Sequence, residues 1–187
     1  MKYPGWVSKY PRRSTCLHWR LVRTIIVLPG TVLFFIPALI LMFTANSRFP
    51  PELITPSQIC FWLALLAAGT GAALCVWTAK LFTKYGDGTP APWDPPRKLV
   101  IIGPYRYVRN PMISGVLLLL LAEALLFHSW PIAAWMILFW VGNVIYFPLV
   151  EEKGLEKRFG DEYLKYKARV PRWIPRVRPW EKSEGAQ

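Results

Sequence analysis

Four apolar segments alternate with polar segments along the chain. Three of them carry no charged residue, and these are 24–44, 58–79 and 132–150. A helix needs about 20 apolar residues to cross the roughly 30 Å hydrocarbon core of a bilayer, so each is long enough to span it. The fourth, 112–127, is shorter and contains Glu123, and the linker "HSWP" after it allows only a tight turn. We therefore predict an all-α membrane bundle of about four transmembrane helices, in which the last two form a hairpin.

The polar segments complete a single membrane domain that covers residues 1–187. A basic arm at 1–23 precedes the bundle at 24–150, the bundle includes a proline- and glycine-rich loop at 80–111, and a tail follows at 151–187. Proline fixes φ, and glycine reaches conformations that are closed to other residues. We therefore expect the loop to hold a defined shape over the membrane.

The start of the tail predicts an amphipathic helix that lies on the bundle or on the membrane surface. The apolar residues at helical spacing are Leu155, Phe159, Tyr163 and Tyr166. Glu151 lies four residues before Leu155, so we expect it to share the inward face, whereas Glu152 lies about a quarter turn away. Gly154 and Gly160 weaken this helix locally.

Two further features predict how the spanning helices pack. Pro29 and Pro37 are expected to kink the first helix or thin its hydrogen bonding. The small residues "AAGTGAA" at 67–73 allow the second helix to approach a neighbour closely. The same gap could instead accommodate a cofactor.

The basic residues lie on one side of the predicted bundle. With four spans, 22 of the 23 Lys and Arg residues fall in segments on the side of the two termini. Cytoplasmic segments carry the excess of Lys and Arg, so we expect both termini in the cytoplasm. Retention beside anionic lipid also accounts for the net charge of +12 without nucleic acid as a partner. We expect no cleavable signal peptide, because about twenty polar, basic and aromatic residues precede the first apolar segment.

The cysteines and histidines argue against two kinds of site. Cys16, Cys60 and Cys75 show no CxxC spacing, so we expect neither a disulfide framework nor a zinc site, and we predict no metal. His18 and His128 lie near no plausible nucleophile. A hydrolase triad is therefore not expected either.

The chemically richest motif is "GPYRYVRNPMISG" at 103–115, at the start of the third apolar segment. The predicted hairpin brings its Asn110 close to Glu151, although 41 positions separate them. Arginines and tyrosines from one segment would then meet the carboxylate pair Glu151 and Glu152 from the other. Two interpretations stay open, namely a ligand site and simple ion pairs between these glutamates and the arginines of the motif.

The two stretches "GDGTPAPWDPPRKLVIIGPYRYVRNPM" and "EEKGLEKRFGDEYLKYKARVPRWIPR" resemble the isoprenylcysteine carboxyl methyltransferase and phospholipid methyltransferase superfamily. The resemblance covers about residues 60–180. Paired motifs that flank a hairpin in this order are more specific than either motif alone. The resemblance implies an integral membrane methyltransferase that uses S-adenosyl-L-methionine, with a small helical bundle in place of a soluble Rossmann fold.

The resemblance also implies a cofactor pocket at the cytoplasmic ends of the last helices. Its residues would be Tyr105, Arg106, Tyr107, Arg109, Asn110, Pro111, Met112, Glu151 and Glu152. A glutamate would accept hydrogen bonds from the ribose hydroxyls or the methionyl amino group, and Arg106 or Arg109 would hold the methionyl carboxylate. Tyr105, Tyr107 or Trp93 would cover the adenine or the sulfonium.

Asn110 marks a departure from many members of the superfamily, which carry histidine there, although phospholipid methyltransferases can show Asn, Pro, Met as here. Asparagine does not titrate near neutrality, so we assign it no general-base role. Whether it alters cofactor binding stays open. A glycine pair is also associated with the cofactor in phospholipid methyltransferases, and Gly69 with Gly71 or Gly86 with Gly88 could match it.

The methyl acceptor is expected to be lipid-like or prenylated and to enter from the bilayer, where Glu123 could assist. A prenylcysteine carboxylate is already a nucleophile at neutral pH, and Arg169 and Arg172 could orient it as catalytic residues. An aminolipid must first lose a proton, and no histidine is placed to take it, although a glutamate or water could serve. We therefore favour O-methylation of a prenylcysteine carboxylate, with a phospholipid or a small thiol as the alternative acceptor.

Two other function classes stay open. One is a noncatalytic membrane scaffold whose basic loops bind anionic headgroups. The other is a small transporter or channel built around Glu123. The sequence alone specifies neither the oligomeric state nor the host membrane.

Overall fold

The structure is a computed structural model that describes residues 29–47, 50–86 and 98–181. No strand occurs in these ranges, so the predicted all-α class is confirmed. The elements in chain order are the π-helical turn η2 Thr31–Phe35, α2 Ile36–Thr44, α3 Ile59–Leu81, the π-helical turn η3 Phe82–Gly86, the 3₁₀ turn η4 Gly103–Arg106, α4 Pro111–Leu126, α5 Trp130–Tyr146, the π-helical turn η5 Phe147–Glu151 and α6 Glu152–Arg169.

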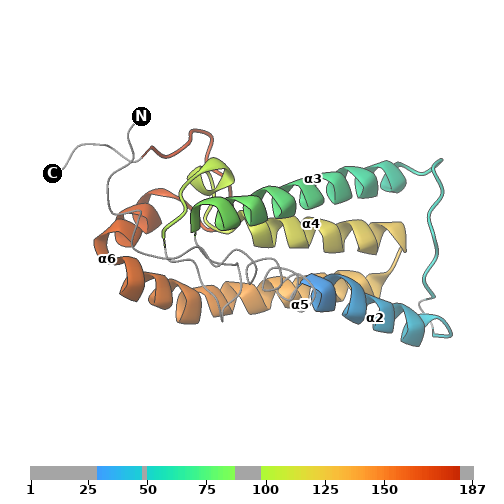
Figure 1. The fold of residues 1–187 in the computed structure, drawn as a ribbon. Coiled ribbons are helices and arrows are strands. Elements are labelled where there is room, and N and C mark those ends of the chain that lie inside the picture. Colours follow the sequence, from blue (N-terminus) through green and yellow to red (C-terminus); the bar gives the residue numbers. More distant parts are fainter. Residues whose placement is uncertain (1–28, 48–49, 87–97, 182–187) are drawn as a thin grey trace, which may run out of the picture.

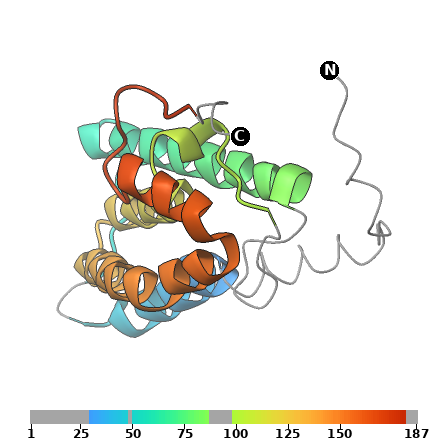
Figure 2. The ribbon, with the colours of Figure 1, turned by 90° about the vertical axis from the view of Figure 1, so that its left-hand side faces the viewer.

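The helices α2 to α5 run lengthwise beside one another (Figure 1, Figure 2). α4 and α5 form the predicted hairpin, closed by residues 127–129. Ile59–Gly86 and Trp130–Arg169 are long and apolar enough to cross a membrane. Thr31–Thr44 and Pro111–Leu126 are apolar but shorter, so the four-span arrangement stays a prediction.

Large apolar side chains cover the outside of this bundle. Their exposed fractions reach 63–74% at Phe34, Phe43, Ile59, Leu66, Trp130 and Leu138. Apolar surface on this scale is unfavourable in water and favourable against lipid tails. The surface is therefore typical of helices that face a bilayer.

α3 and α4 approach closely at two glycines. A Cβ added to Gly71 would lie 2.7 Å from the carbonyl oxygen of Gly115, and a Cβ on Gly115 would lie 2.8 Å from Sγ of Cys75. Small residues of this kind let two helix backbones pack together. The close approach predicted from residues 67–73 is confirmed, and a Cβ on Gly69 would meet only open space.

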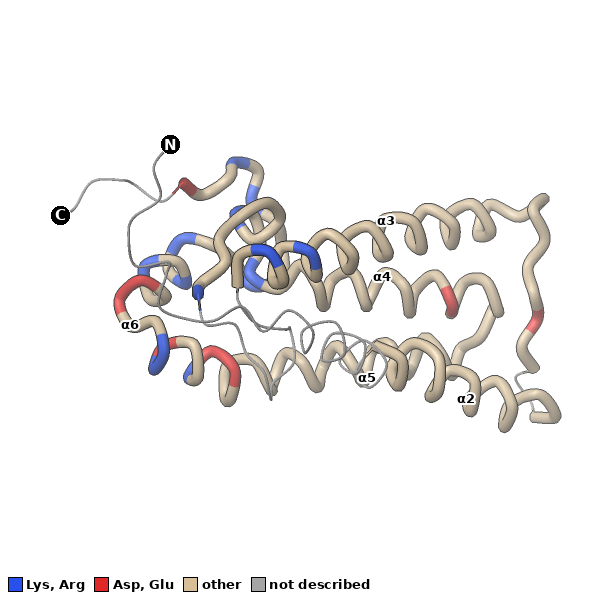
Figure 3. Tube along the Cα trace, viewed as in Figure 1, with Lys and Arg blue, Asp and Glu red and all other residues tan. Residues whose placement is uncertain are grey.

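The described Lys and Arg residues gather at one end of the bundle (Figure 3). At the other end, the backbone N–H of Glu52 donates to the carbonyl of Phe127 at 3.0 Å, and Glu123 lies in the last turn of α4. This separation matches the predicted one-sided distribution of charge. The basic arm and residues 24–28 of the first predicted span lie outside the described residues, and the orientation of the termini stays a prediction.

Proline and glycine determine the bends in the helices. η2 ends two residues before Pro37, and η5 contains Pro148. Proline lacks an N–H and its ring clashes with the carbonyl four residues earlier, and a wider π-helical turn accommodates both effects. α6 continues from α5 through η5 and then bends at Gly160, where φ is 52° and ψ is −131°. The expected weak point at Gly160 is therefore confirmed.

Candidate functional site

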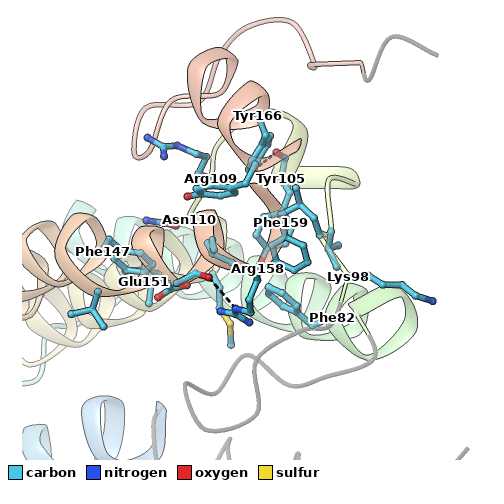
Figure 4. A pocket seen from close by; sticks show the side chains of 18 of the residues that line it. Phe82, Lys98, Tyr105, Arg109, Asn110, Phe147, Glu151, Arg158, Phe159 and Tyr166 are labelled. Carbon is cyan, nitrogen blue, oxygen red and sulfur yellow. Dashed lines mark hydrogen bonds between the residues drawn. The ribbon is translucent and has the colours of Figure 1, made fainter. Parts of the chain in front are cut away.

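A cavity of about 380 Å³ lies at the basic end of the bundle (Figure 4). Three segments that are distant in the sequence form it, and pockets of this size are typical of small-molecule sites. Its lining residues are Phe82, Lys98, Leu99, Val100, Tyr105, Arg109, Asn110, Met112, Ile113, Tyr146, Phe147, Val150, Glu151, Gly154, Leu155, Arg158, Phe159, Tyr163 and Tyr166. The predicted juxtaposition of Asn110 with Glu151 is therefore confirmed.

One face of the continuous helix from α5 to α6 provides a wall of the cavity. Phe147, Glu151, Leu155, Arg158 and Phe159 line it at spacings of one, three or four positions. Residues three or four positions apart lie on the same side of a helix, as Phe147, Glu151 and Leu155 do, and Arg158 and Phe159 follow Leu155 at three and four positions. The predicted inward face with Glu151, Leu155 and Phe159 is confirmed, and Arg158 adds to it.

Tyr105 anchors the wall that lies across the cavity from this face. Its side chain is buried and packs edge-to-face on Phe82, with 5.3 Å between the ring centroids. Its carbonyl accepts a hydrogen bond of 2.7 Å from Oη of Tyr166. Burial raises the pKa of the Tyr105 phenol well above its ordinary value, and the charges of Tyr166 and Glu151 act in the same direction. The ring is therefore neutral at physiological pH.

The bend at Gly160 lets the second half of α6 pack on the segment that leads to Tyr105. Tyr163, Tyr166 and Val170 form a buried cluster, and Leu99 and Ile101 pack against it. The sequence predicted an amphipathic helix either on the bundle or on the membrane surface. In the structure, this half of α6 packs on the protein. This contact also brings Tyr163 and Tyr166 to the cavity.

Glu151 lies in the cavity with Arg158 pointing toward it (Figure 4). Burial raises the pKa of the Glu151 carboxyl to about 7, the charge of Arg158 opposes this rise, and the charge of Glu152 adds to it. The Glu151 carboxyl therefore keeps its proton to a higher pH than an exposed glutamate does. A cationic ligand group beside it would favour the ionised form.

Glu152 is 3% exposed and lies in a different environment, which we call the ion cluster and define as Glu152, Arg109, Lys167 and Arg172. Oε1 of Glu152 accepts from Nη1 of Arg109 at 2.8 Å and from Nε of Arg172 at 2.7 Å, and Oε2 lies 3.0 Å from Nζ of Lys167. Burial alone would raise the pKa of Glu152, but its three cationic partners lower it below the ordinary value. The ion-pair interpretation of the sequence is confirmed for this glutamate.

Arg106 and Tyr107 face the tail and do not line the cavity. Nη2 of Arg106 donates to Oε1 of Glu181 at 2.7 Å, and its Nε donates to the carbonyl of Trp180 at 3.0 Å. The carbonyl of Tyr107 accepts from the backbone N–H of Arg176 at 3.0 Å. In this geometry both predicted cofactor residues fasten the tail to the motif.

The start of α4 places the next three predicted residues. Pro111 is buried in the first turn, where its missing N–H costs nothing, and Asn110 and Met112 line the cavity. Nδ2 of Asn110 is buried, and no atom in the described part of the chain accepts a hydrogen bond from it. An unpartnered buried donor is costly, so a ligand oxygen at this point would be stabilised.

Arg169 and Arg172 do not line the cavity either. Arg169 is exposed at the end of α6, where its carbonyl accepts from Nη1 of Arg176 at 3.0 Å, and Arg172 belongs to the ion cluster. Their role in orienting an acceptor stays a prediction.

Of the predicted glycine pairs, Gly69, Gly71 and Gly86 are not among the lining residues. Gly71 is used in the crossing of α3 with α4, Gly69 faces open space, and Gly86 is buried at the end of η3. Gly88 and Trp93 lie outside the described residues.

Sequence reasoning missed Arg158, Phe82 and Lys98 as lining residues. Arg158 lies two helical turns after Glu151, so an extension of the inward face would have found it. Phe82 ends the second apolar segment and Lys98 lies in the loop. No periodic pattern connects either of them to the tail, and the structure alone brings them together.

Comparison with known proteins bears on the chemistry of this cavity. Residues 59–162, more than half of the chain, match the family of phospholipid methyltransferases. The chain belongs to this phospholipid methyltransferase family. The resemblance to the wider superfamily is thereby confirmed, and this is a family of membrane methyltransferases that generally use S-adenosylmethionine. No curated protein matches the sequence. Both sequence elements that meet in the cavity, the Asn110 motif and Glu151 to Phe159, lie inside the range that matches the family.

Proposed function

We propose that this protein is an integral membrane methyltransferase that transfers a methyl group from S-adenosylmethionine to a lipophilic acceptor. The observation that carries the proposal is the cavity in which the 103–115 motif meets the Glu151 face, in a chain of a methyltransferase family. When bound, S-adenosylmethionine supplies a methyl group on a positively charged sulfur. The protein then has to align the acceptor with that methyl group and exclude water.

The residues of the cavity fit such a molecule. Seven aromatic side chains line it, and aromatic faces attract cations such as a sulfonium; they are Phe82, Tyr105, Tyr146, Phe147, Phe159, Tyr163 and Tyr166. The polar groups are few, as is usual for a small-molecule site, and the unpartnered Nδ2 of Asn110 is one of them.

The membrane arrangement that we propose has four spans, both termini in the cytoplasm and the cavity at the cytoplasmic surface, in one domain over 1–187. It is supported by the collection of Lys and Arg at the cavity end and by the exposed apolar surface along the bundle. A lipid-like acceptor would then reach the cavity from the adjacent leaflet.

For the acceptor we propose a prenylcysteine carboxylate first, because a carboxylate needs no base to become a nucleophile. A phospholipid amine is the second candidate, because the matching family is named for phospholipids. An ammonium group must lose a proton before it can accept a methyl group.

The test uses the full chain in lipid nanodiscs with radiolabelled S-adenosylmethionine. N-Acetyl-S-farnesylcysteine and phosphatidylethanolamine are supplied in parallel, and the labelled products are separated. We expect methyl transfer to the farnesylcysteine carboxylate, whereas transfer to the phospholipid alone would replace the first acceptor with the second. Calorimetry should also detect S-adenosylhomocysteine binding at or below the millimolar range.

A scaffold would behave differently in the same preparations. It would bind anionic headgroups with an affinity that falls steeply with salt, because exposed charges are screened. It would show no binding of S-adenosylhomocysteine and no dependence on Glu151. That result would contradict the proposed enzyme.

A further inference from the structure

The chain after α6 presents apolar side chains to the outside. This tail segment, residues 171–180, lies at the basic end of the bundle on the side of α3 (Figure 1, Figure 2). Ile174 is 79% exposed and Val177 is 96% exposed, and Arg178 beside them is exposed as well. Single exposed apolar residues are ordinary on a protein surface. Here two of them lie three positions apart next to a cation, which makes a small amphipathic surface.

The protein holds the tail segment in a fixed position. The backbone N–H of Arg176 donates to the carbonyl of Tyr107 at 3.0 Å. The backbone N–H of Trp180 donates to the carbonyl of Arg106 at 2.9 Å, and the Trp180 ring packs on Tyr166 with 5.8 Å between the centroids. The fold itself therefore presents the two apolar side chains to the outside.

The tryptophans of α3 mark the depth of the membrane surface. α3 has 23 residues, so it is about 34 Å long, close to the roughly 30 Å of a hydrocarbon core. Trp62 and Trp77 lie near its two ends and are 59% and 52% exposed. Tryptophan is enriched at both membrane–water interfaces. Trp77 therefore marks the interface at the basic end of the bundle.

The tail segment is attached close to this depth. A Cβ added to Gly103, the first residue of η4, would lie 3.2 Å from Cζ2 of Trp77, so η4 packs on α3 at the interface. Arg106 and Tyr107 follow in the same motif, and their carbonyls bind the tail segment. The exposed apolar side chains of the tail segment therefore lie near the headgroup layer of the adjacent leaflet.

The backbone of the tail segment is suited to a partly dehydrated layer. A backbone N–H without a partner becomes costly where water is scarce. Pro171, Pro175 and Pro179 have no N–H, and the N–H groups of Arg176 and Trp180 are already bonded to the motif. Few donors of this segment would therefore lose a partner beside lipid.

The charge of Arg178 favours an anionic partner. Within the described part of the chain, no carboxylate forms a salt bridge with it, and Glu181, the acid that follows, is paired with Arg106 at 2.7 Å. A guanidinium binds phosphate oxygens with two parallel hydrogen bonds. Basic residues beside a membrane are attracted to anionic lipid.

We propose that residues 174–178 dock on anionic phospholipid of the adjacent leaflet, with Ile174 and Val177 among the upper acyl chains and Arg178 on a headgroup phosphate. Apolar side chains gain free energy when they leave water, and the long arginine side chain reaches the headgroups from the same segment. This inference uses the proposed membrane arrangement and does not depend on methyl transfer.

The competing explanation is that the same side chains bind another protein chain. A stable protein interface buries about 800 Å² on each partner, which so short a segment does not supply. A lipid surface, in contrast, lies next to every copy of a protein that spans the membrane. The two partners give different products in a crosslinking experiment.

The experiment places the photoreactive residue p-benzoylphenylalanine at single positions of the full chain in nanodiscs. The nanodiscs contain phosphatidylcholine and phosphatidylglycerol, and mass spectrometry identifies the adducts after illumination. Val177 is the test position, and Leu66, 68% exposed on α3, is the positive control. Asp161 is the negative control, because it is exposed at the bend of α6, which lies at the end of the molecule away from the bundle (Figure 1).

We expect phospholipid adducts at positions 177 and 66 and none at 161. Phosphatidylglycerol should be enriched about fivefold over its share of the bilayer at position 177, the effect expected of one basic residue. Position 66 should show no enrichment, because acyl chains carry no charge. Arg178→Gln should abolish the enrichment at 177, whereas Lys157→Gln removes the same charge from an exposed position of α6 and should leave it unchanged.

The outcomes separate this inference from the proposed function. Lipid adducts at 66 without any at 177 would show that the tail segment faces water, and adducts at 177 that join two protein chains would favour a protein partner; either result overturns the proposal. An enrichment that survives Arg178→Gln would contradict the role of that residue. Binding of S-adenosylhomocysteine by the same preparations would leave the proposed function standing in each of these cases.

Discussion

Glu151 and Glu152 are adjacent in the sequence, yet they belong to two regions with opposite electrostatics. Glu151 lies in the cavity, where burial raises the pKa of its carboxyl to about 7. Glu152 lies in the ion cluster, where two arginines and a lysine lower the pKa of its carboxyl. One residue rotates an α-helix by about 100°, so neighbouring side chains point to different surroundings.

The two environments suit the two glutamates to different roles, namely structural support at Glu152 and ligand binding at Glu151. The ion cluster joins the start of α6 to Arg109 of the motif and to Arg172 of the tail. Its charges are satisfied within the protein, which favours one conformation. Within the described part of the chain, the exposed Arg158 is the charge that lowers the pKa of the Glu151 carboxyl. A carboxylate in this state is suited to a ligand, and the two positions should respond to mutation in opposite ways.

The largest effect is expected from Glu152→Gln. The change leaves Arg109, whose side chain is 11% exposed, without its charged partner, so unfolding should become easier by about 3 kcal/mol. For a chain of this size that corresponds to a thermal midpoint lower by roughly 6–12 °C in detergent. The control is Glu181→Gln, which breaks the pair of Arg106 with a side chain that is 78% exposed and should shift the midpoint little. Equal shifts for both variants would show that the ion cluster is not the support we infer.

The next effect is expected from Gly160→Ala, because the bend supports both regions. A φ of 52° with a ψ of −131° is strained for a residue with a Cβ, at a cost of about 2 kcal/mol. The thermal midpoint should fall, and S-adenosylhomocysteine affinity should fall with it, since Tyr163 and Tyr166 line the cavity beyond the bend. Gly154→Ala is the matched control: a Cβ there meets only Nη2 of Arg158 at 3.7 Å, an ordinary contact. Gly154→Ala should raise the free energy of unfolding by up to about 1 kcal/mol, because alanine favours a helix more than glycine does. A loss of stability in Gly154→Ala would contradict the expected difference between the two glycines.

Glu151→Gln should weaken S-adenosylhomocysteine binding about tenfold at pH 7.5, or about 1.4 kcal/mol, without lowering thermal stability. Glutamine keeps the shape and an acceptor oxygen but removes the charge that attracts an ammonium. Calorimetry measures the affinity, and the matched control is Glu162→Gln, an exposed glutamate of α6 that does not line the cavity. A destabilised Glu151→Gln with normal affinity would reverse the roles assigned to the two glutamates.

The dependence of stability on pH distinguishes the two carboxyls by sign. The pKa of Glu151 rises from an ordinary 4.5 to about 7 on folding, so its contribution to stability falls as pH rises through that window. Glu151→Gln should therefore match the unmodified protein near pH 5 and exceed its thermal midpoint near pH 8. The pKa of Glu152 is lowered, so its stabilisation is present above the ordinary value and is lost as pH falls through the folded one. Identical pH profiles for Glu151→Gln and the unmodified protein would show that burial does not hold a proton on Glu151.

Much of this architecture could be predicted from the chain itself. Long uncharged segments predict membrane helices because lipid tails do not solvate charges, and the short linker between two of them requires a hairpin. The hairpin alone brings Asn110 to Glu151, since its two ends must lie side by side. The four-residue spacing of Glu151 and Leu155 was likewise sufficient to place both on one inward face.

The partners of individual side chains depended on the tertiary structure. Arg106 and Arg109 are equivalent in the sequence motif, but the first binds the tail at Glu181 and the second binds Glu152. A periodic pattern specifies the face of a helix, not which of several cations reaches a given carboxylate. That choice depends on where the tail crosses the motif, and the crossing follows from the bend at Gly160.

The sequence by itself determined the helical class, the hairpin, the collection of positive charge at one end and the family, because these depend on composition, length and local spacing. The tertiary structure decided which cations enclose Glu152, and it added Arg158, Phe82 and Lys98 to the lining of the cavity that Glu151 faces. The physical reason is that burial and charge pairing are properties of neighbours in space. Two adjacent glutamates can therefore have the same local sequence and opposite shifts of pKa.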